Sequence, residues 1–195
     1  MSLTEDAKKF VVNKMGSDRL SGYPHAERVL KSALSLQRIH GGDHELIELA
    51  VIMHDVAFDG KNIATHATES ANIADTFLEE NGVEFKRRQK IKKIIERHTV
   101  RDWTMNGAPE TIEEKIVFDA EAIERISMHG FLKFITTSHN LPYSNTGQVV
   151  RALEKFVDEN YKSIFFESTK HHVQKSYFLL KTVIEEIRDG ANIKS

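Results

Sequence analysis

Residues 49–57 read Leu49-Ala50-Val51-Ile52-Met53-His54-Asp55-Val56-Ala57, an apolar run that ends in a histidine beside an aspartate. The apolar residues are typical of a buried helix, so the two polar side chains are placed against the interior of the protein. Burying a carboxylate without a partner costs several kcal/mol, which is on the order of the whole stability of a small domain. We therefore interpret His54-Asp55 as half of a metal site.

The composition of the chain is that of a globular protein. With 195 residues, of which 40% are apolar and 29% charged, it can bury a full core, and we expect a single domain over residues 1–195. The net charge is −2 and no long block of one sign occurs. Composition therefore offers no argument for a nucleic-acid polymer or an anionic membrane as partner, while small phosphorylated ligands stay open.

Two absences in the sequence narrow the kind of metal site and the location to expect. The sequence has no cysteine, which excludes disulfides and thiolate ligands and leaves histidine and carboxylate side chains as the metal ligands to expect. Its first residues lack a basic stretch followed by an apolar one, and no run of about 18 apolar residues occurs. We expect a cytoplasmic protein, and the sequence leaves its oligomeric state open.

The spacing of apolar residues predicts an all-α protein. Only three prolines and ten glycines occur, and no segment alternates like a strand. Asp43 is a suitable N-cap for the helix that carries His54, and Asn106-Gly107-Ala108-Pro109 reads as a loop. The expected helices cover about residues 3–14, 24–39, 44–54, 65–80, 84–98, 112–126, 128–137, 148–159 and 168–188.

Several of these helices place polar side chains on or beside their apolar faces. A single histidine in such a position is usually a hydrogen-bonded core residue, and Asp119 alone could form a buried ion pair with Arg28 or Arg125. Together the groups favour a divalent ion, for which nitrogen and oxygen ligands suit Mn, Fe, Co, Ni or Zn and also allow Mg. The residues concerned are His25, His54, Asp55, His66, His98 and Asp119.

The order and context of these residues resemble the HD-domain superfamily of metal-dependent phosphohydrolases. The segment His25-Ala26-Glu27-Arg28-Val29 is similar to the His-x-x-Arg-Val opening of that family, and residues 50–55 to its apolar helix ending in His-Asp. Residues 116–121, Ile-Val-Phe-Asp-Ala-Glu, are similar to its closing Asp-Ala-Asp segment. The resemblance spans about residues 20–130, and leaves residues 131–195 as a C-terminal helical extension.

This resemblance implies a helical fold in which His25, His54, Asp55 and Asp119 ligate one divalent cation. It implies that Asp55 stays ionised, and that His66 and His98 line the substrate pocket, where they donate a proton to the leaving group or contact the phosphate. In relatives with two metals, histidines at such positions bind the second ion, so a second ion is also possible here.

The sequence departs from the family pattern at two positions. Phe58 stands where many members carry a basic residue after the His-Asp pair, so phosphate contacts are expected from Arg28, Lys61 or Lys115. Glu121 replaces the second aspartate of the closing segment, which keeps the charge but changes the reach.

The expected function is hydrolysis of a small phosphate ester or anhydride, a nucleotide above all, by water that the metal activates. An apolar group or base of the substrate could rest on Phe58, Trp103 or Phe131. Two alternatives stay open: a two-iron oxygenase to which His66 and His98 contribute ligands, and a non-catalytic binding or regulatory module in which the ion only holds helices together.

Overall fold

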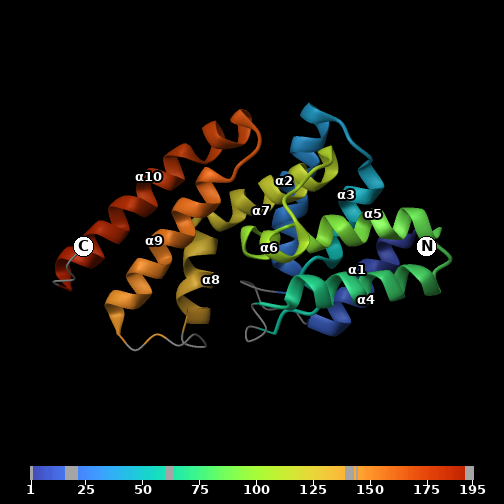
Figure 1. The fold of residues 1–195 in the computed structure, drawn as a ribbon, viewed down its shortest axis with the longest axis horizontal. Helices are drawn as coiled ribbons and strands as arrows, with labels where there is room; N and C mark the ends of the chain where they lie inside the picture. Colours follow the sequence, from blue (N-terminus) through green and yellow to red (C-terminus); the bar gives the residue numbers. More distant parts are fainter. Residues whose placement is uncertain (1, 16–21, 60–63, 139–142, 144, 192–195) are drawn as a thin grey trace. The chain divides into compact units, whose positions relative to one another are not determined.

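The computed structural model describes residues 2–15, 22–59, 64–138, 143 and 145–191, and over these residues it contains helices and no strand. The predicted all-α class is confirmed. The elements are α1 (Leu3–Met15), α2 (Tyr23–His40), α3 (His44–Met53), α4 (His66–Glu80), α5 (Phe85–Glu96), the 3-10 helix η1 (Val100–Asp102), α6 (Trp103–Asn106), α7 (Ile112–Arg125), α8 (Met128–Ser138), α9 (Thr146–Lys162) and α10 (Glu167–Gly190) (Figure 1).

The chain divides into two compact units, Met1–Glu121 and Ala122–Ser195, and the boundary falls within α7. The first unit therefore holds all the residues that the sequence predicts as ligands or catalytic groups. The prediction of a single domain with a core over about residues 20–130 stays a prediction.

Helix α3 is the centre of the first unit. Seven of its ten residues are buried, which is typical of a helix enclosed on most of its sides. It contacts α1, α2 and α5, while α4 packs along α5 (Figure 1). Because α3 is enclosed in this way, His54 and Asp55, which follow its last turn, lie in the interior.

Local sequence signals explain where α2 begins and ends and where α3 begins. The side chain of Asp43 accepts hydrogen bonds from the backbone N–H groups of Glu45 and Leu46, as the predicted N-cap should. Pro24 lies in the first turn of α2. Gly41 ends α2 with a φ of 83°, a left-handed conformation that glycine adopts without steric cost.

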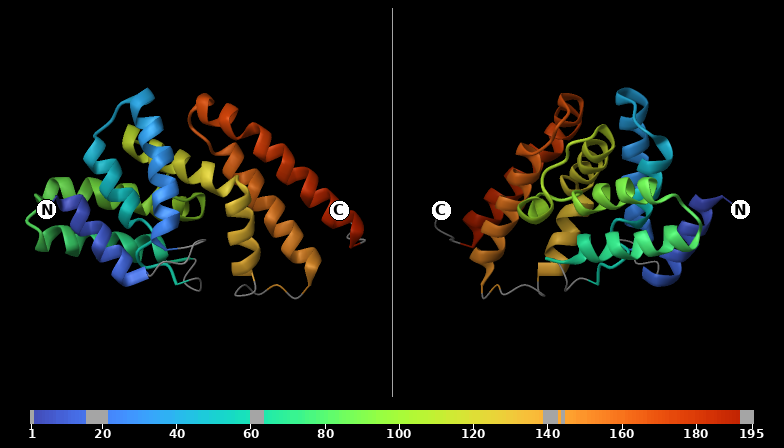
Figure 2. Two further views of the ribbon diagram at one scale, coloured as in Figure 1. Left: turned by 180° about the vertical axis from the view of Figure 1, so that it is seen from behind. Right: turned by 45° about the vertical axis from the view of Figure 1, so that its right-hand side comes forward.

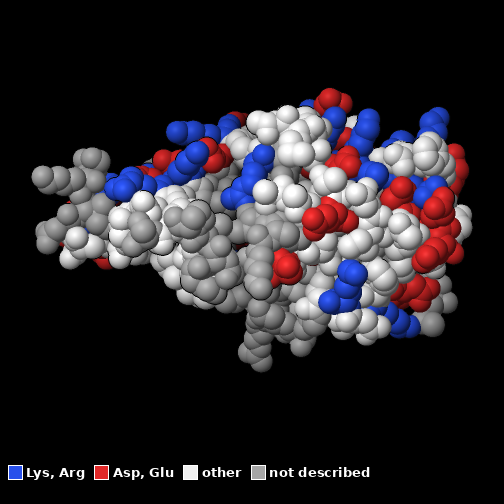
Figure 3. Space-filling view, turned by 60° about the horizontal axis from the view of Figure 1, so that its bottom comes forward, with Lys and Arg blue, Asp and Glu red and all other residues white. Residues whose placement is uncertain are grey.

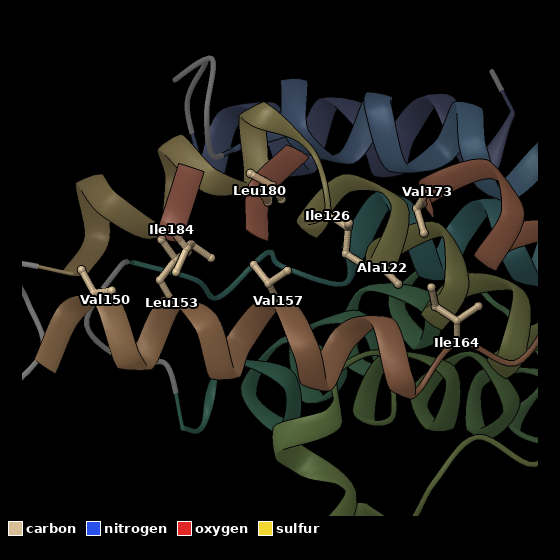
Figure 4. Packing of buried hydrophobic residues seen from close by; sticks show 9 residues of the cluster. All are labelled: Ala122, Ile126, Val150, Leu153, Val157, Ile164, Val173, Leu180 and Ile184. Carbon is tan, nitrogen blue, oxygen red and sulfur yellow. The ribbon is translucent and has the colours of Figure 1, made fainter. Parts of the chain in front are cut away.

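The second unit has its own apolar core between α9 and α10, which run side by side in both views of Figure 2. Val150, Leu153 and Val157 of α9 point toward Leu180 and Ile184 of α10 (Figure 4). All five side chains are buried, so this core is formed by facing helical stripes.

The turn from α7 into α8 is tight. A methyl group on Gly130 would collide with the backbone carbonyl of Arg125, so α8 can follow α7 this closely because position 130 is glycine. Phe131, one of the aromatic residues considered for substrate contact, packs against the core of this second unit.

Lysine and arginine side chains are interspersed with aspartate and glutamate on the face drawn in Figure 3. This mixture agrees with the small net charge of −2. Among the described residues, no helix combines the length and the apolar character that crossing a membrane requires.

Candidate metal centre

The His-Asp pair lies directly beyond the end of α3. His54 keeps a helical conformation at the C-cap, and both side chains are buried. The Nδ1 atom of His54 lies 2.7 Å from the carbonyl oxygen of Val51. Because a carbonyl can only accept, Nδ1 carries the proton in the neutral ring, and Nε2 is left to face the interior with its lone pair.

Three further side chains converge on this Nε2 atom of His54. The nearest is Glu121, whose Oε1 atom lies 2.8 Å away, and the Nε2 atom of His25 lies at 3.3 Å. The Oδ2 atom of Asp55 is 3.5 Å from His54 Nε2. It is also 3.5 Å from His25 Nε2, and Glu121 Oε1 lies 3.1 Å from the same atom. Residues from α2, α7 and the end of α3 thus meet at one point.

These spacings fit a common cation. Ligand atoms about 2.0 to 2.2 Å from one ion in tetrahedral arrangement lie about 3.3 to 3.6 Å from one another, and octahedral neighbours slightly closer. The separations observed here run from 2.8 to 3.5 Å. With two nitrogen and two oxygen donors, all buried, the group matches a site for a divalent transition metal or Mg.

A second group of ligand atoms adjoins the first through Asp55. The Oδ1 atom of Asp55 lies 3.5 Å from His66 Nε2 and 3.7 Å from His98 Nε2. The Nδ1 atom of His98 is 2.6 Å from the carbonyl oxygen of Ile95, which turns Nε2 toward the carboxylate. The two oxygens of Asp55 therefore face different pairs of histidines, and this carboxylate links the two groups.

The charge balance of the centre favours a cation. Burial by itself would lower the pKa of His54, but the carboxylates of Asp55 and Glu121 outweigh it and raise the pKa to about 10. The two carboxylates therefore stabilise positive charge at this position. A metal ion bound to His54 would supply that charge and displace the proton, so metal affinity at the centre should rise with pH.

A buried serine holds the turn after the His-Asp pair against α4. The hydroxyl of Ser70 accepts a hydrogen bond of 3.0 Å from the backbone N–H of Ala57. Ser70 lies one helical turn after His66 on α4. The bond therefore holds the segment that carries Asp55 against the helix that carries His66.

A buried ion pair joins the end of α5 to the start of α7. Arg97 donates from Nη1 to Oε2 of Glu114 over 2.9 Å, and from Nε to the carbonyl oxygen of Asn106 over 2.8 Å. Arg97 directly precedes His98, and Glu114 lies two helical turns before Glu121 on α7. This pair thus connects the segments that carry His98 and Glu121.

Of the four ligands predicted from sequence, the structure brings together His25, His54 and Asp55. Asp119 is fully buried but is in neither of the two sets of described residues whose ligand atoms lie within 4.8 Å of one another, which are His25-His54-Glu121 and His54-Asp55-His98. Glu121, which the sequence analysis did not assign as a ligand, lies next to His25 and His54, and the role of Asp119 as a ligand stays a prediction. Two residues along a helix turn the side chain by about 200°, so Asp119 and Glu121 leave α7 in different directions.

The structure gives less information about the three residues that the sequence predicts as phosphate contacts. Arg28 lies on α2 one turn after His25 and is half-buried, and Lys115 is half-buried on α7. Lys61 lies outside the described residues. The roles of all three stay predictions.

The two remaining aromatic residues differ in position. Trp103 packs against Phe118 with ring centroids 5.0 Å apart, which is a core contact. Phe58 packs edge to face against His66 with centroids 5.4 Å apart. Phe58 therefore packs directly against a residue of the metal centre.

The family model of the HD domain matches residues 22–126. No curated protein matches the sequence.

Solved structures share the fold. The chain is similar to a protein from Lactobacillus plantarum (15% identity, 98% of this chain and 98% of that chain, TM-score 0.81). It is also similar to an HD-superfamily hydrolase from Bacillus thuringiensis (23% identity, 98% and 97%, TM-score 0.63) and to YpgQ of Bacillus subtilis in complex with ADP (16% identity, 96% and 97%, TM-score 0.63). At these identities the likeness shows the fold alone.

Proposed function

The chain belongs to the HD-domain family, and from this premise we propose that it is a metal-dependent phosphohydrolase of small phosphate esters or anhydrides, with nucleotides as substrates. The observation that carries the proposal is the convergence of two imidazoles and two carboxylates on one buried point. Such a set costs a protein stability unless a cation compensates it, and a bound divalent cation can activate water for attack on a phosphoryl group.

The ligands that we propose for the ion are His25, His54, Asp55 and Glu121. When bound, a divalent cation would make a water molecule acidic enough to act as a nucleophile near neutral pH, and would offset negative charge on a phosphoryl oxygen. The carbonyl of Val51 holds His54 in the tautomer that presents Nε2.

His66 and His98 would then transfer the proton and bind the phosphate. His66 and His98 face the second oxygen of Asp55 at 3.5 Å and 3.7 Å, close enough to act beside a phosphoryl group held there. His66 is the more exposed of the two, with 9% of its side chain accessible against 0% for His98. We assign His66 to protonation of the leaving group and His98 to orientation of the phosphate.

Two observations support a nucleotide as the substrate. YpgQ, which shares the fold, was crystallised with ADP. In this chain, Phe58 offers an aromatic ring against His66, on which a base could stack.

The second group of histidines favours one alternative function. If His66 and His98 bind a second ion together with Asp55, the centre could hold two irons and act as an oxygenase, since the carboxylate of Asp55 already lies between both groups. Metal stoichiometry and oxygen consumption separate this alternative from a phosphohydrolase.

The test combines metal analysis with a substrate screen. We expect purified protein to retain a divalent ion and, with Mn, Co, Ni, Fe, Zn or Mg supplied, to release phosphate from at least one nucleotide or aryl phosphate. Metal-loaded protein that is inactive across the panel would contradict the proposal. About two irons per chain with oxygen uptake would support the oxygenase. Unfolding on chelation without any turnover would support a metal that only holds the helices together.

The fourth ligand can be tested directly, since sequence and structure favour different residues. We expect Glu121→Gln to weaken metal binding by more than about 100-fold, because loss of even an outer partner of a ligand costs 10- to 100-fold. Asp119→Asn should have a smaller effect. Competition with a chelator measures both affinities, and Glu186→Gln, an exposed position on α10, is the control. The reverse order of effects would restore Asp119 as the ligand.

A further inference from the structure

An open cavity of about 730 Å³ lies at the surface of the first unit, next to the segment that follows the His54-Asp55 pair. The end of α1, the segment after the His-Asp pair and α4 line it. Its size is within the range of sites for small organic molecules, about 300 to 1,000 Å³. The lining residues that matter below are Lys14, Phe58, Asp59, Glu69 and Ile73.

The wall of this cavity is continuous with the metal centre. Phe58 lines the cavity and packs against His66, and His66 lies 3.5 Å from Asp55. The backbone N–H of Phe58 also donates to the carbonyl of Asp55 over 2.7 Å. Two side-chain contacts, Phe58 to His66 and His66 to Asp55, therefore connect the cavity with a proposed metal ligand. One small substrate could reach the cavity and the metal centre at the same time.

The charges of the lining indicate which part of a substrate the cavity suits. Among the described residues that line the cavity, Asp59 and Glu69 contribute exposed carboxylates and Lys14 contributes an ammonium group. Carboxylates repel phosphate and accept hydrogen bonds from N–H donors. Phe58 and Ile73 add apolar surface for a flat ring. This lining disfavours a second phosphate and favours an uncharged aromatic group that carries N–H donors.

We propose that this cavity binds the nucleobase of the substrate while the phosphate lies at the metal centre, with Phe58 as the stacking surface and Glu69 as an acceptor from the base. The inference rests on the proposed phosphohydrolase function and adds a specificity site to it. Phe58 then contacts both halves of the substrate site, the base in the cavity and the phosphate beside His66. This dual role gives a reason for an aromatic residue at position 58.

A second hollow along the same helix supplies the comparison. It measures about 300 Å³ and is lined by Phe10, Phe77 and Glu80, among others. Glu80 lies eleven residues after Glu69 on α4, which is about three helical turns, so both side chains share one face of the helix. Glu80→Gln therefore removes the same charge from the same face without touching the proposed base site.

The experiment uses the full chain and separates base binding from catalysis. Adenosine, guanosine, cytidine and uridine, which carry no phosphate and so cannot be hydrolysed, are titrated by calorimetry into the metal-loaded protein. We expect at least one nucleoside to bind, and Glu69→Gln to weaken its binding about tenfold or more, as expected for a lost hydrogen bond to a charged group. Glu80→Gln should leave the affinity unchanged.

A kinetic measurement completes the test. In the same metal-loaded protein, Glu69→Gln should raise KM for the nucleotide more than KM for p-nitrophenyl phosphate, because the nitrophenyl ring has no N–H donor for the carboxylate of Glu69. If phosphate is released but no nucleoside binds, or if Glu69→Gln and Glu80→Gln act alike, the base site is wrong while the proposed function stands. If nucleosides bind but no phosphate is released from any substrate, the proposed function is wrong while the base site stands.

Discussion

Replacement of Asp55 by alanine is expected to lower phosphate release by roughly a thousandfold or more, which corresponds to about 4 kcal/mol of lost transition-state stabilisation. The physical reason is the position of its two oxygens. Oδ2 lies 3.5 Å from His25 and His54, while Oδ1 lies 3.5 Å from His66. One substitution therefore removes a ligand from the first group and the partner of the second.

The fold should survive this change. Asp55 follows the end of α3 and its side chain completes no helix, so circular dichroism should show unchanged helix content while metal analysis shows loss of the ion. Asp189→Ala, at an exposed position on α10, is the matched control. Asp55→Asn, which keeps the shape of the side chain, serves if the alanine variant does not fold. Activity and metal content near those of the unmodified protein in either variant would contradict the assignment.

Replacement of Glu114 by alanine should lower the free energy of unfolding by about 3 kcal/mol or more, the largest loss of stability that we predict. Glu114 is almost fully buried and accepts hydrogen bonds from Arg97 at 2.9 Å and from the backbone N–H of Glu110 at 2.7 Å. Its removal leaves the guanidinium of Arg97, only 12% exposed, with the exposed carboxylate of Glu110 at 3.2 Å as its ion-pair partner. For a chain of this length the loss corresponds to a fall in Tm of about 6 to 12 °C.

Thermal and denaturant unfolding measure this loss of stability. An exposed ion pair serves as the control. Glu5 and Lys8 lie 3.0 Å apart at the surface, so Glu5→Ala should cost less than about 1 kcal/mol. The double variant Arg97→Met with Glu114→Leu should recover part of the loss, because no buried charge remains. An effect of Glu114→Ala no larger than that of Glu5→Ala would show that the buried pair contributes little.

Sequence periodicity predicted the long helices because their signals are local. Asp43 caps α3 as expected, and α2 ends at His40, one residue beyond the predicted end. The short elements η1 and α6, in a region without an assigned helix, were not predicted, since three or four residues carry too little periodicity. The fifth predicted helix reached His98, whereas α5 ends at Glu96. His98 is nevertheless fully buried, because it lies in the turn that follows.

The sequence by itself determined which kinds of groups could form the centre. Without cysteine the ligands had to be imidazoles and carboxylates, and the apolar run before His54 required that this histidine and Asp55 be buried. These conclusions depend on composition and on positions along single helices. They did not need the spatial arrangement of one helix against another.

Only the tertiary structure decided which side chains meet. Asp119 and Glu121 are both buried on α7, and their places in the sequence do not tell which one faces α2 and the end of α3. The packing of separate helices brings Glu121 to 3.1 Å from His25 and 2.8 Å from His54, and turns the two oxygens of Asp55 toward different histidines. The reason is that side-chain direction follows helix rotation, and helix rotation is set by the packing of the whole core.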